Sequence, residues 1–120
     1  MPRDFKLYLS DILRSVERIN RLLASLDEAA FKKNDVAVDG ILFNLLTIGE
    51  AVKNVPEDVL KHLPEARWRE MARFRDRVVH HYFSLDLNIV WEIVTVHVPI
   101  LKTNVETLLQ DIEAGGSSQE

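Results

Sequence analysis

"VDGILFNLLTIGEAVKNV", residues 38–55, is the stretch that decides the fold. Its apolar residues recur at spacings of three and four, at Val38, Ile41, Leu45, Ile48, Val52 and Val55. This spacing predicts one buried face of an amphipathic helix that is capped by Asn34 or Asp35 and runs to about Asn54. Gly49 lies on the same face and costs about 1 kcal/mol against alanine in a helix interior, so we expect another helix to approach closely there.

The rest of the chain carries similar patterns. A first helix is predicted over residues 5–26, where apolar residues again alternate in steps of four and three. Pro56 and Pro64 each begin a short piece, and a third main helix is predicted from about Arg67 to Tyr82. A fourth begins after the capping residues 84–86 and continues past Pro99, which should kink it around 96–98. The sequence therefore predicts an all-α fold, an antiparallel bundle of four main helices plus a short connecting helix.

Length and composition set the outer limits. The 120 residues fit a single helical domain over 1–114, followed by a disordered tail, "GGSSQE", at 115–120. No apolar run approaches the ~18 residues that cross a bilayer, so we expect no membrane association. The absence of cysteine and of a signal-peptide pattern favours a cytoplasmic protein. The net charge of −4 argues against indiscriminate binding to nucleic acid.

Positive charge is nevertheless concentrated in the third helix. Residues 67–81 contain five arginines and two histidines against two acidic residues. On a helical wheel Arg69, Arg73, Arg77 and His80 form one basic row opposite the apolar stripe. The row is either a solvated surface or a binding site for phosphate groups.

Arg75 differs from this row because the wheel places it within the apolar stripe. A charged side chain in such a position needs a carboxylate or a phosphate as its partner. Asp76 points about 100° away, whereas Glu50 on the preceding main helix could approach from outside, so a structural ion pair is one explanation. Arg75 and His80 are about 140° apart on an ideal helix, and spacing alone predicts no catalytic pair. A looser helix near His80, or an edge completed by a second protomer, would bring them together.

Self-association is suggested by a second strip on the helix of residues 38–55. The strip lies away from the buried face and consists of Phe43, Leu46, Thr47, Glu50 and Asn54. A helix with two apolar-bearing faces leaves one of them exposed to water in a monomer, and a second protomer could cover it. A symmetric dimer would also bring two basic rows together.

The stretch "RDRVVHHY", residues 75–82, follows Arg73 and Phe74 and resembles a motif of a known protein family. Arg75, four residues, His80, one residue and Tyr82 resemble the signature of the HepT-like branch of the HEPN ribonuclease superfamily. "DILRSVERI", "ILFNLLTIGEAVKNVPEDV" and "HYFSLDLNIVWEIV" also look like the corresponding helices of that family, so the likeness covers almost the whole chain.

The resemblance implies the toxin of a type VII-like toxin–antitoxin pair, a homodimer or higher oligomer that cleaves RNA without a metal ion or other cofactor. Arg75 and His80 match the family's catalytic pair in a cleft between protomers. Tyr82 matches the tyrosine to which the cognate minimal nucleotidyltransferase antitoxin (MntA-like) adds AMP, and the added charge would block the basic cleft. Asp76 and His81 stand where the family often has asparagine and glycine.

The residue types suit this chemistry. A base that takes the proton of the RNA 2′-hydroxyl and a cation that steadies the charge on the phosphate are sufficient, and His80 and Arg75 can fill these roles. Arg69, Arg73, Arg77 and His81 are candidates for binding RNA phosphates, with Glu50 and Asp76 in support. No zinc-type spacing is present. The alternative is a non-catalytic helical subunit that binds a nucleotide or a nucleotidyltransferase.

Two further groups are expected to pack instead of bind. His97 lies near Pro99 on the fourth helix, and Trp68 and Trp91 both fall on apolar stripes.

Overall fold

The computed structural model describes residues 4–118 and, within them, every side chain except those of 65 and 115–118. The described residues form helices and contain no strand, which confirms the all-α fold. In chain order the elements are α1 (Phe5–Leu23), α2 (Glu28–Lys33), α3 (Asp35–Lys53), α4 (Glu57–Leu60), η1 (Pro64–Ala66), α5 (Trp68–His81), η2 (Tyr82–Ser84), α6 (Leu87–Glu92), η3 (Ile93–His97) and α7 (Val98–Ser118).

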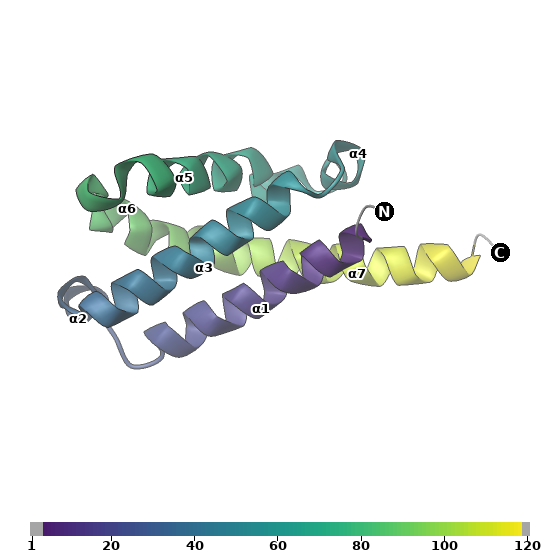
Figure 1. The fold of residues 1–120 in the computed structure, drawn as a ribbon. Coiled ribbons are helices and arrows are strands. Elements are labelled where there is room, and N and C mark those ends of the chain that lie inside the picture. The colour runs from purple at the N-terminus through teal and green to yellow at the C-terminus, as the bar shows by residue number, and fades with distance from the viewer. Residues whose placement is uncertain (1–3, 119–120) are drawn as a thin grey trace.

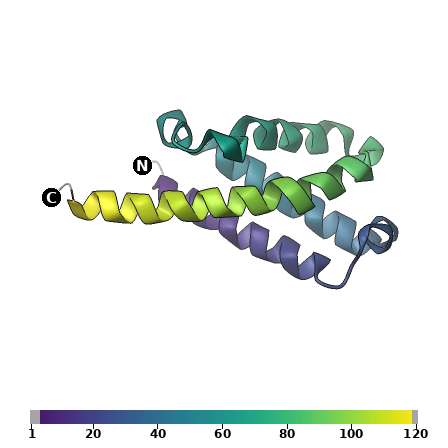
Figure 2. The same cartoon turned by 180° about the vertical axis from the view of Figure 1, so that it is seen from behind.

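The long helices pack side by side along the length of the molecule (Figure 1). α3 lies between α1 and α5 and packs on both, while α7 packs on α1. Seen from behind, α7 crosses the other side of the bundle and its C-terminal part extends beyond the remaining helices (Figure 2). The apolar face predicted for residues 38–55 points into the common core, where Ile41, Leu45 and Ile48 are fully buried.

Local sequence accounts for the helix starts. The side chains of Asp4, Asp27, Asn34 and Asp86 each accept a hydrogen bond from a backbone N–H in the first turn of the helix that follows. α2 was not predicted: its stretch interrupts the apolar pattern of α1, but Asp27 caps it and Phe31 anchors it in the core.

Pro99 disturbs the fourth helical segment, although not by a simple kink. A π-helical segment, η3, runs from Ile93 to His97 between α6 and α7. Pro99 has no N–H to donate to the carbonyl of Thr95, and the wider turn begins several residues before it. The N–H of Val98 accordingly donates to the carbonyl of Ile93, five residues back.

The C-terminal end differs from the prediction. α7 continues to Ser118, so the helix does not stop at residue 114 despite the two glycines at 115 and 116. Residues 119 and 120 of the predicted disordered tail lie outside the described residues. None of the helices in the described range combines the length and apolar character needed to cross a bilayer.

Candidate functional site

α5 carries the predicted site residues, and its core-facing stripe fixes its orientation. Trp68, Met71, Phe74 and Val78 are buried at spacings of three and four. The indole N–H of Trp68 donates to the carbonyl of Leu63 at 2.8 Å, which ties the start of α5 to the preceding turn. The remaining positions of α5 therefore point to its two flanks or to solvent. Trp68 is a core residue, as predicted, and Trp91 packs against the core beside Phe31.

Gly49 is where α3 and α5 come closest. A Cβ built on Gly49 would lie 2.3 Å from Cβ of Arg75 and 3.1 Å from the carbonyl oxygen of Met71. The close approach of another helix, predicted from the position of Gly49, is thus made by α5, and it is made at Arg75 itself. The backbone of Arg75 is held against α3, so its side chain leaves the helix at a fixed point.

The guanidinium of Arg75 lies between two carboxylates. Its Nη1 donates to Oδ1 of Asp76 at 3.0 Å, and its Nη2 is 3.7 Å from Oε1 of Glu50. Glu50 approaches from α3, the direction that its helix face predicts. Asp76 is the nearer partner, although the wheel directs its backbone position away from Arg75. The long arginine side chain spans that angle, and with 27% of it exposed it remains open to a ligand.

Lys53 completes this charged cluster, and the sequence analysis missed it. Its Nζ is 2.9 Å from Oδ1 of Asp76, the oxygen that also accepts from Arg75. The hydrogen bonds from Lys53 and Arg75 hold the pKa of the Asp76 carboxyl below its usual value. Lys53 is three residues after Glu50 on α3, so its position on the same edge of that helix was the available signal.

His80 is exposed one helical turn after Asp76. α5 remains α-helical through His81, so the helix does not loosen before His80. The guanidinium of Arg75 instead points toward Asp76, to which it donates a hydrogen bond. Asp76 and His80 share a face of α5 because they are four residues apart. The imidazole of His80 forms no hydrogen bond or ion pair with another described residue.

Tyr82 begins the turn η2 directly after α5, and its hydroxyl donates a hydrogen bond to the carboxylate of Asp39 on α3. This hydrogen bond raises the pKa of Tyr82 above its usual value. Phe83 beside it is 99% exposed and meets the Tyr82 ring edge-on, with the ring centroids 5.3 Å apart. Asp39 was also missed, because its pairing with Tyr82 depends on the register of α3 against α5.

The basic row does not converge on Arg75. Arg75 borders a hollow of about 460 Å³ together with Leu46, Thr47, Glu50 and Val79, which we call the Arg75 pocket. Arg73 and Arg77 border a separate hollow of about 320 Å³ on the other flank of α5.

The other members of the predicted set lie outside both hollows. Arg69 pairs with Glu57 at 3.7 Å, and His81 is exposed at the end of α5. In the described part of the chain, no three His, Asp or Glu side chains gather as a metal site would require.

Known proteins resemble this chain over most of its length. The model of the family described as "Ribonuclease HepT-like" matches residues 12–108. The "Putative RNase MJ0127" of Methanocaldococcus jannaschii is 37% identical over 94% of this chain and 94% of its own length. The "Probable ribonuclease HepT" of Thermococcus cleftensis is 40% identical over 90% of this chain and 98% of its own length. No solved structure matches the chain.

Proposed function

Because the chain belongs to the HepT-like ribonuclease family, we propose that it is an endonuclease toxin of a type VII-like toxin–antitoxin pair, with Arg75 and His80 as its catalytic pair. The observation that carries this proposal is the placement of Arg75. Its guanidinium is fixed between α3 and α5 and remains partly exposed beside a hollow, and the same helix presents His80 to solvent.

The reaction needs only groups that the two copies of α5 in a dimer supply. His80 takes the proton of a 2′-hydroxyl, the 2′ oxygen bonds to the adjacent phosphorus, and the bond from phosphorus to the 5′ oxygen breaks. Arg75 steadies the negative charge that develops on the phosphate oxygens. The leaving 5′ oxygen takes a proton from a second imidazole, for which His81 or the second protomer's copy of His80 is available. The products are a cyclic phosphate and a 5′-hydroxyl, and no metal ion is required.

A dimer would complete the site. α3 and α5 carry exposed apolar side chains: Val36 is 79% exposed, Phe43 60%, and Val79, which lines the Arg75 pocket, 49%. Burying such side chains in a symmetric interface removes them from water and brings two Arg75 pockets toward each other. Phe83 extends the same apolar character to the end of α5.

Tyr82 is the proposed acceptor of AMP from a minimal nucleotidyltransferase antitoxin. Its ring is exposed at the end of α5, two residues beyond His80, and its hydroxyl already donates to Asp39. A nucleotide attached there would place a phosphate charge and a bulky group beside the pair of Arg75 and His80. Both would compete with the RNA, which accounts for silencing.

A second function is favoured by the same ion pairs. The contacts of Arg75 with Glu50 and Asp76 are also what a purely structural arginine would make. In that case the chain would be a non-catalytic subunit that binds a nucleotide or a nucleotidyltransferase.

Replacing His80 separates the two functions. The purified full chain, shown by intact mass to carry no AMP, is incubated with RNA in the presence of a metal chelator. His80→Ala should lower cleavage by about 10²–10⁴ while the melting temperature and oligomeric state stay unchanged. His62→Ala, which changes another exposed histidine, should cleave like the wild type. Equal cleavage by both variants would exclude His80 as the base, and no cleavage by any of them would favour the binding subunit.

A further inference from the structure

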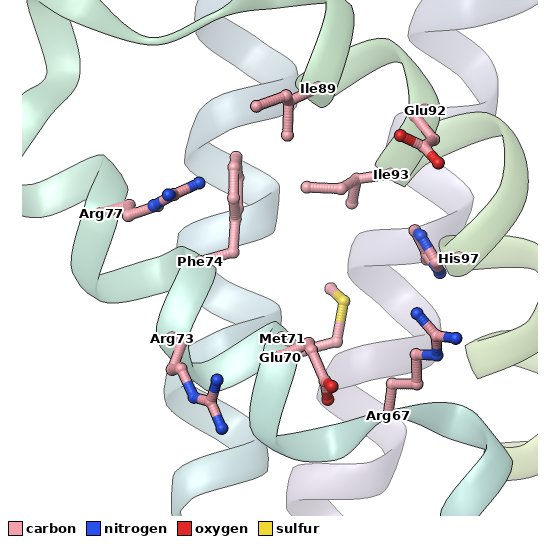
Figure 3. A pocket seen from close by; sticks show the side chains of 10 residues that line it. All are labelled: Arg67, Glu70, Met71, Arg73, Phe74, Arg77, Ile89, Glu92, Ile93 and His97. Atoms are coloured by element: carbon pink, nitrogen blue, oxygen red, sulfur yellow. The ribbon is translucent and has the colours of Figure 1, made fainter.

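The hollow on the other flank of α5 has the features of a ligand pocket. It lies between α5, α6 and η3, and Figure 3 shows its lining side chains. Met71 and Phe74 from α5 and Ile89 and Ile93 from the opposite wall give it an apolar floor. Three arginines, Arg67, Arg73 and Arg77, stand around this floor. We call it the Arg73 pocket.

Its arginines are available to a ligand. Arg69 and Arg75 elsewhere on α5 both pair with carboxylates. The guanidinium groups of Arg67, Arg73 and Arg77 make no ion pair or hydrogen bond with another described residue, although Glu70 and Glu92 line the same pocket. Exposed guanidinium groups around an apolar floor are suited to a ligand that has an anionic end and a flat apolar body.

Two unusual backbone conformations meet at the Arg73 pocket. Arg67 has φ 54° and ψ 50°, the left-handed conformation, and is the residue with positive φ among the described non-glycine residues. η3, the π-helical segment, supplies Ile93 and His97 to the opposite wall. Left-handed non-glycine residues and π-helical turns both cost free energy and both occur preferentially at functional sites.

We propose that the Arg73 pocket is a second RNA-binding site that holds one unpaired nucleotide of the substrate strand, with its base on Phe74 and Ile93 and its phosphate on Arg73 and Arg77. This inference rests on the ribonuclease function proposed above and adds to it a site away from Arg75. The volume of about 320 Å³ suits a single nucleotide and excludes a base pair. Single-stranded RNA is bound in this way elsewhere, through unstacked bases against apolar or aromatic side chains and phosphates on arginines.

The charges give the pocket a direction. In Figure 3 Arg73 and Arg77 extend from α5 on one side, and Glu92 lies across the apolar floor on the other. When the phosphate of the nucleotide lies beside Arg73 and Arg77, the hydrogen-bonding edge of its base faces Glu92. The carboxylate accepts a hydrogen bond from the exocyclic amino group of cytosine but repels the carbonyl oxygen at the same position of uracil. The pocket should therefore prefer cytidine to uridine.

Binding of uncleavable RNA tests this inference without requiring catalysis. Fluorescence anisotropy is measured on the full chain with two labelled 2′-O-methyl octamers, one of cytidine and one of uridine. We expect the cytidine octamer to bind about tenfold more tightly. Arg73→Ala with Arg77→Ala should weaken both octamers and lower the slope of log affinity against log salt by about 0.7, the value for one neutralised phosphate of a single strand.

Two further variants separate the pocket from the general field of charge. Ile89→Trp fills the mouth without changing charge, and should weaken the cytidine octamer and remove its advantage over uridine. Ile89 is 38% exposed, so the larger side chain can be accommodated without loss of the fold, as a thermal melt will show. Arg18→Ala with Arg21→Ala removes the same charge from the exposed face of α1, and the preference for cytidine should remain.

Equal affinity of the wild type for both octamers, or unchanged binding by Ile89→Trp, would overturn the proposal. So would free CMP that binds as tightly as the octamer, because the ligand would then be a mononucleotide. The outcome is independent of the proposed cleavage. Wild-type protein that prefers cytidine but cuts no RNA would support the second site and exclude the ribonuclease mechanism. Wild-type protein that cuts RNA but does not prefer cytidine would exclude the second site and leave the ribonuclease mechanism unaffected.

Discussion

The two flanks of α5 hold their arginines in different ways. On the flank that packs against α3, Arg75 leaves the helix opposite Gly49 and its guanidinium lies between Glu50 and Asp76. On the flank toward α6, Arg73 and Arg77 stand without ion pairs to described residues around an apolar pocket. An arginine whose position is fixed before the substrate arrives suits charge stabilisation at one point of a transition state. Arginines without ion-pair partners suit the binding of a flexible strand, because they are free to pair with its phosphates.

The largest effect expected from this contrast is on the rate of cleavage. Arg75→Gln should lower kcat by about 10²–10³, because the charge on the phosphate then loses its fixed partner. Arg77→Gln on the other flank should raise KM several-fold and leave kcat nearly unchanged, since it removes binding that substrate and transition state share. Steady-state cleavage of a fluorogenic oligoribonucleotide measures both constants. If Arg75→Gln changed KM alone, the two flanks would not differ in the way described.

The contact between α3 and α5 should be the next most sensitive feature. Gly49→Ala places a methyl group against Cβ of Arg75 and the carbonyl of Met71, and neither can move without separating the helices. We expect a loss of about 1–3 kcal/mol in the free energy of unfolding, measured by urea denaturation.

Gly40→Ala on the same helix is the matched control. Its added Cβ would meet chiefly Cδ1 of Leu22 at 2.9 Å, the flexible end of a side chain. The higher helix propensity of alanine should offset that contact, so the stability should change little or rise. Equal losses at the two glycines would show that the close approach at Gly49 has no special role.

Acid should weaken the Arg75 flank selectively. The Asp76 carboxyl has a lowered pKa in the folded chain, because Lys53 and Arg75 donate hydrogen bonds to it. Its contribution to stability is therefore fully present above the unfolded pKa of about 3.9 and is lost as the pH falls through the folded value. Asp76→Asn should be less stable than the wild type near neutral pH, and the difference should shrink below about pH 4. If the difference in stability between the wild type and Asp76→Asn stayed constant from neutral pH to the acid limit, the charge of Asp76 would not be what holds α5 to α3.

The smallest effect is expected at Tyr82 in the isolated chain. Tyr82→Phe loses an exposed hydrogen bond to Asp39 and should lower stability by no more than about 1 kcal/mol, with cleavage within about twofold of the wild type. With the nucleotidyltransferase and ATP present, however, the variant should gain no AMP by intact mass and should keep its activity. Tyr8→Phe, at the other tyrosine of the chain, should still be modified and silenced.

The sequence could predict the helices because their apolar periodicity and caps are local properties. Asn34 caps α3 and Gly49 meets α5, both as predicted. α2 was missed because a six-residue helix shows too little periodicity, and the end of α7 was misplaced because the two glycines did not stop the helix.

The site was less predictable because it depends on tertiary register. Glu50 could be placed beside Arg75 from helix faces alone. The hydrogen bonds from Lys53 to Asp76 and from Tyr82 to Asp39 join residues 23 and 43 positions apart in the sequence. They can be predicted only when the register of α3 against α5 is known. The wheel also grouped Arg69, Arg73 and Arg77 as one row, whereas the structure places Arg69 beside Glu57 and the other two at the Arg73 pocket.

The most direct test of the central claim mixes two inactive variants. Arg75→Gln and His80→Ala are each expected to be nearly inactive alone, and they are mixed under conditions in which the subunits exchange. If Arg75 of one protomer acts with His80 of the other, half of the dimers are mixed, and one of the two sites in each mixed dimer keeps both side chains. Cleavage should then return to about a quarter of the wild-type rate. A mixture that stays as inactive as its components, although mass spectrometry shows mixed dimers, would contradict a shared Arg75–His80 site.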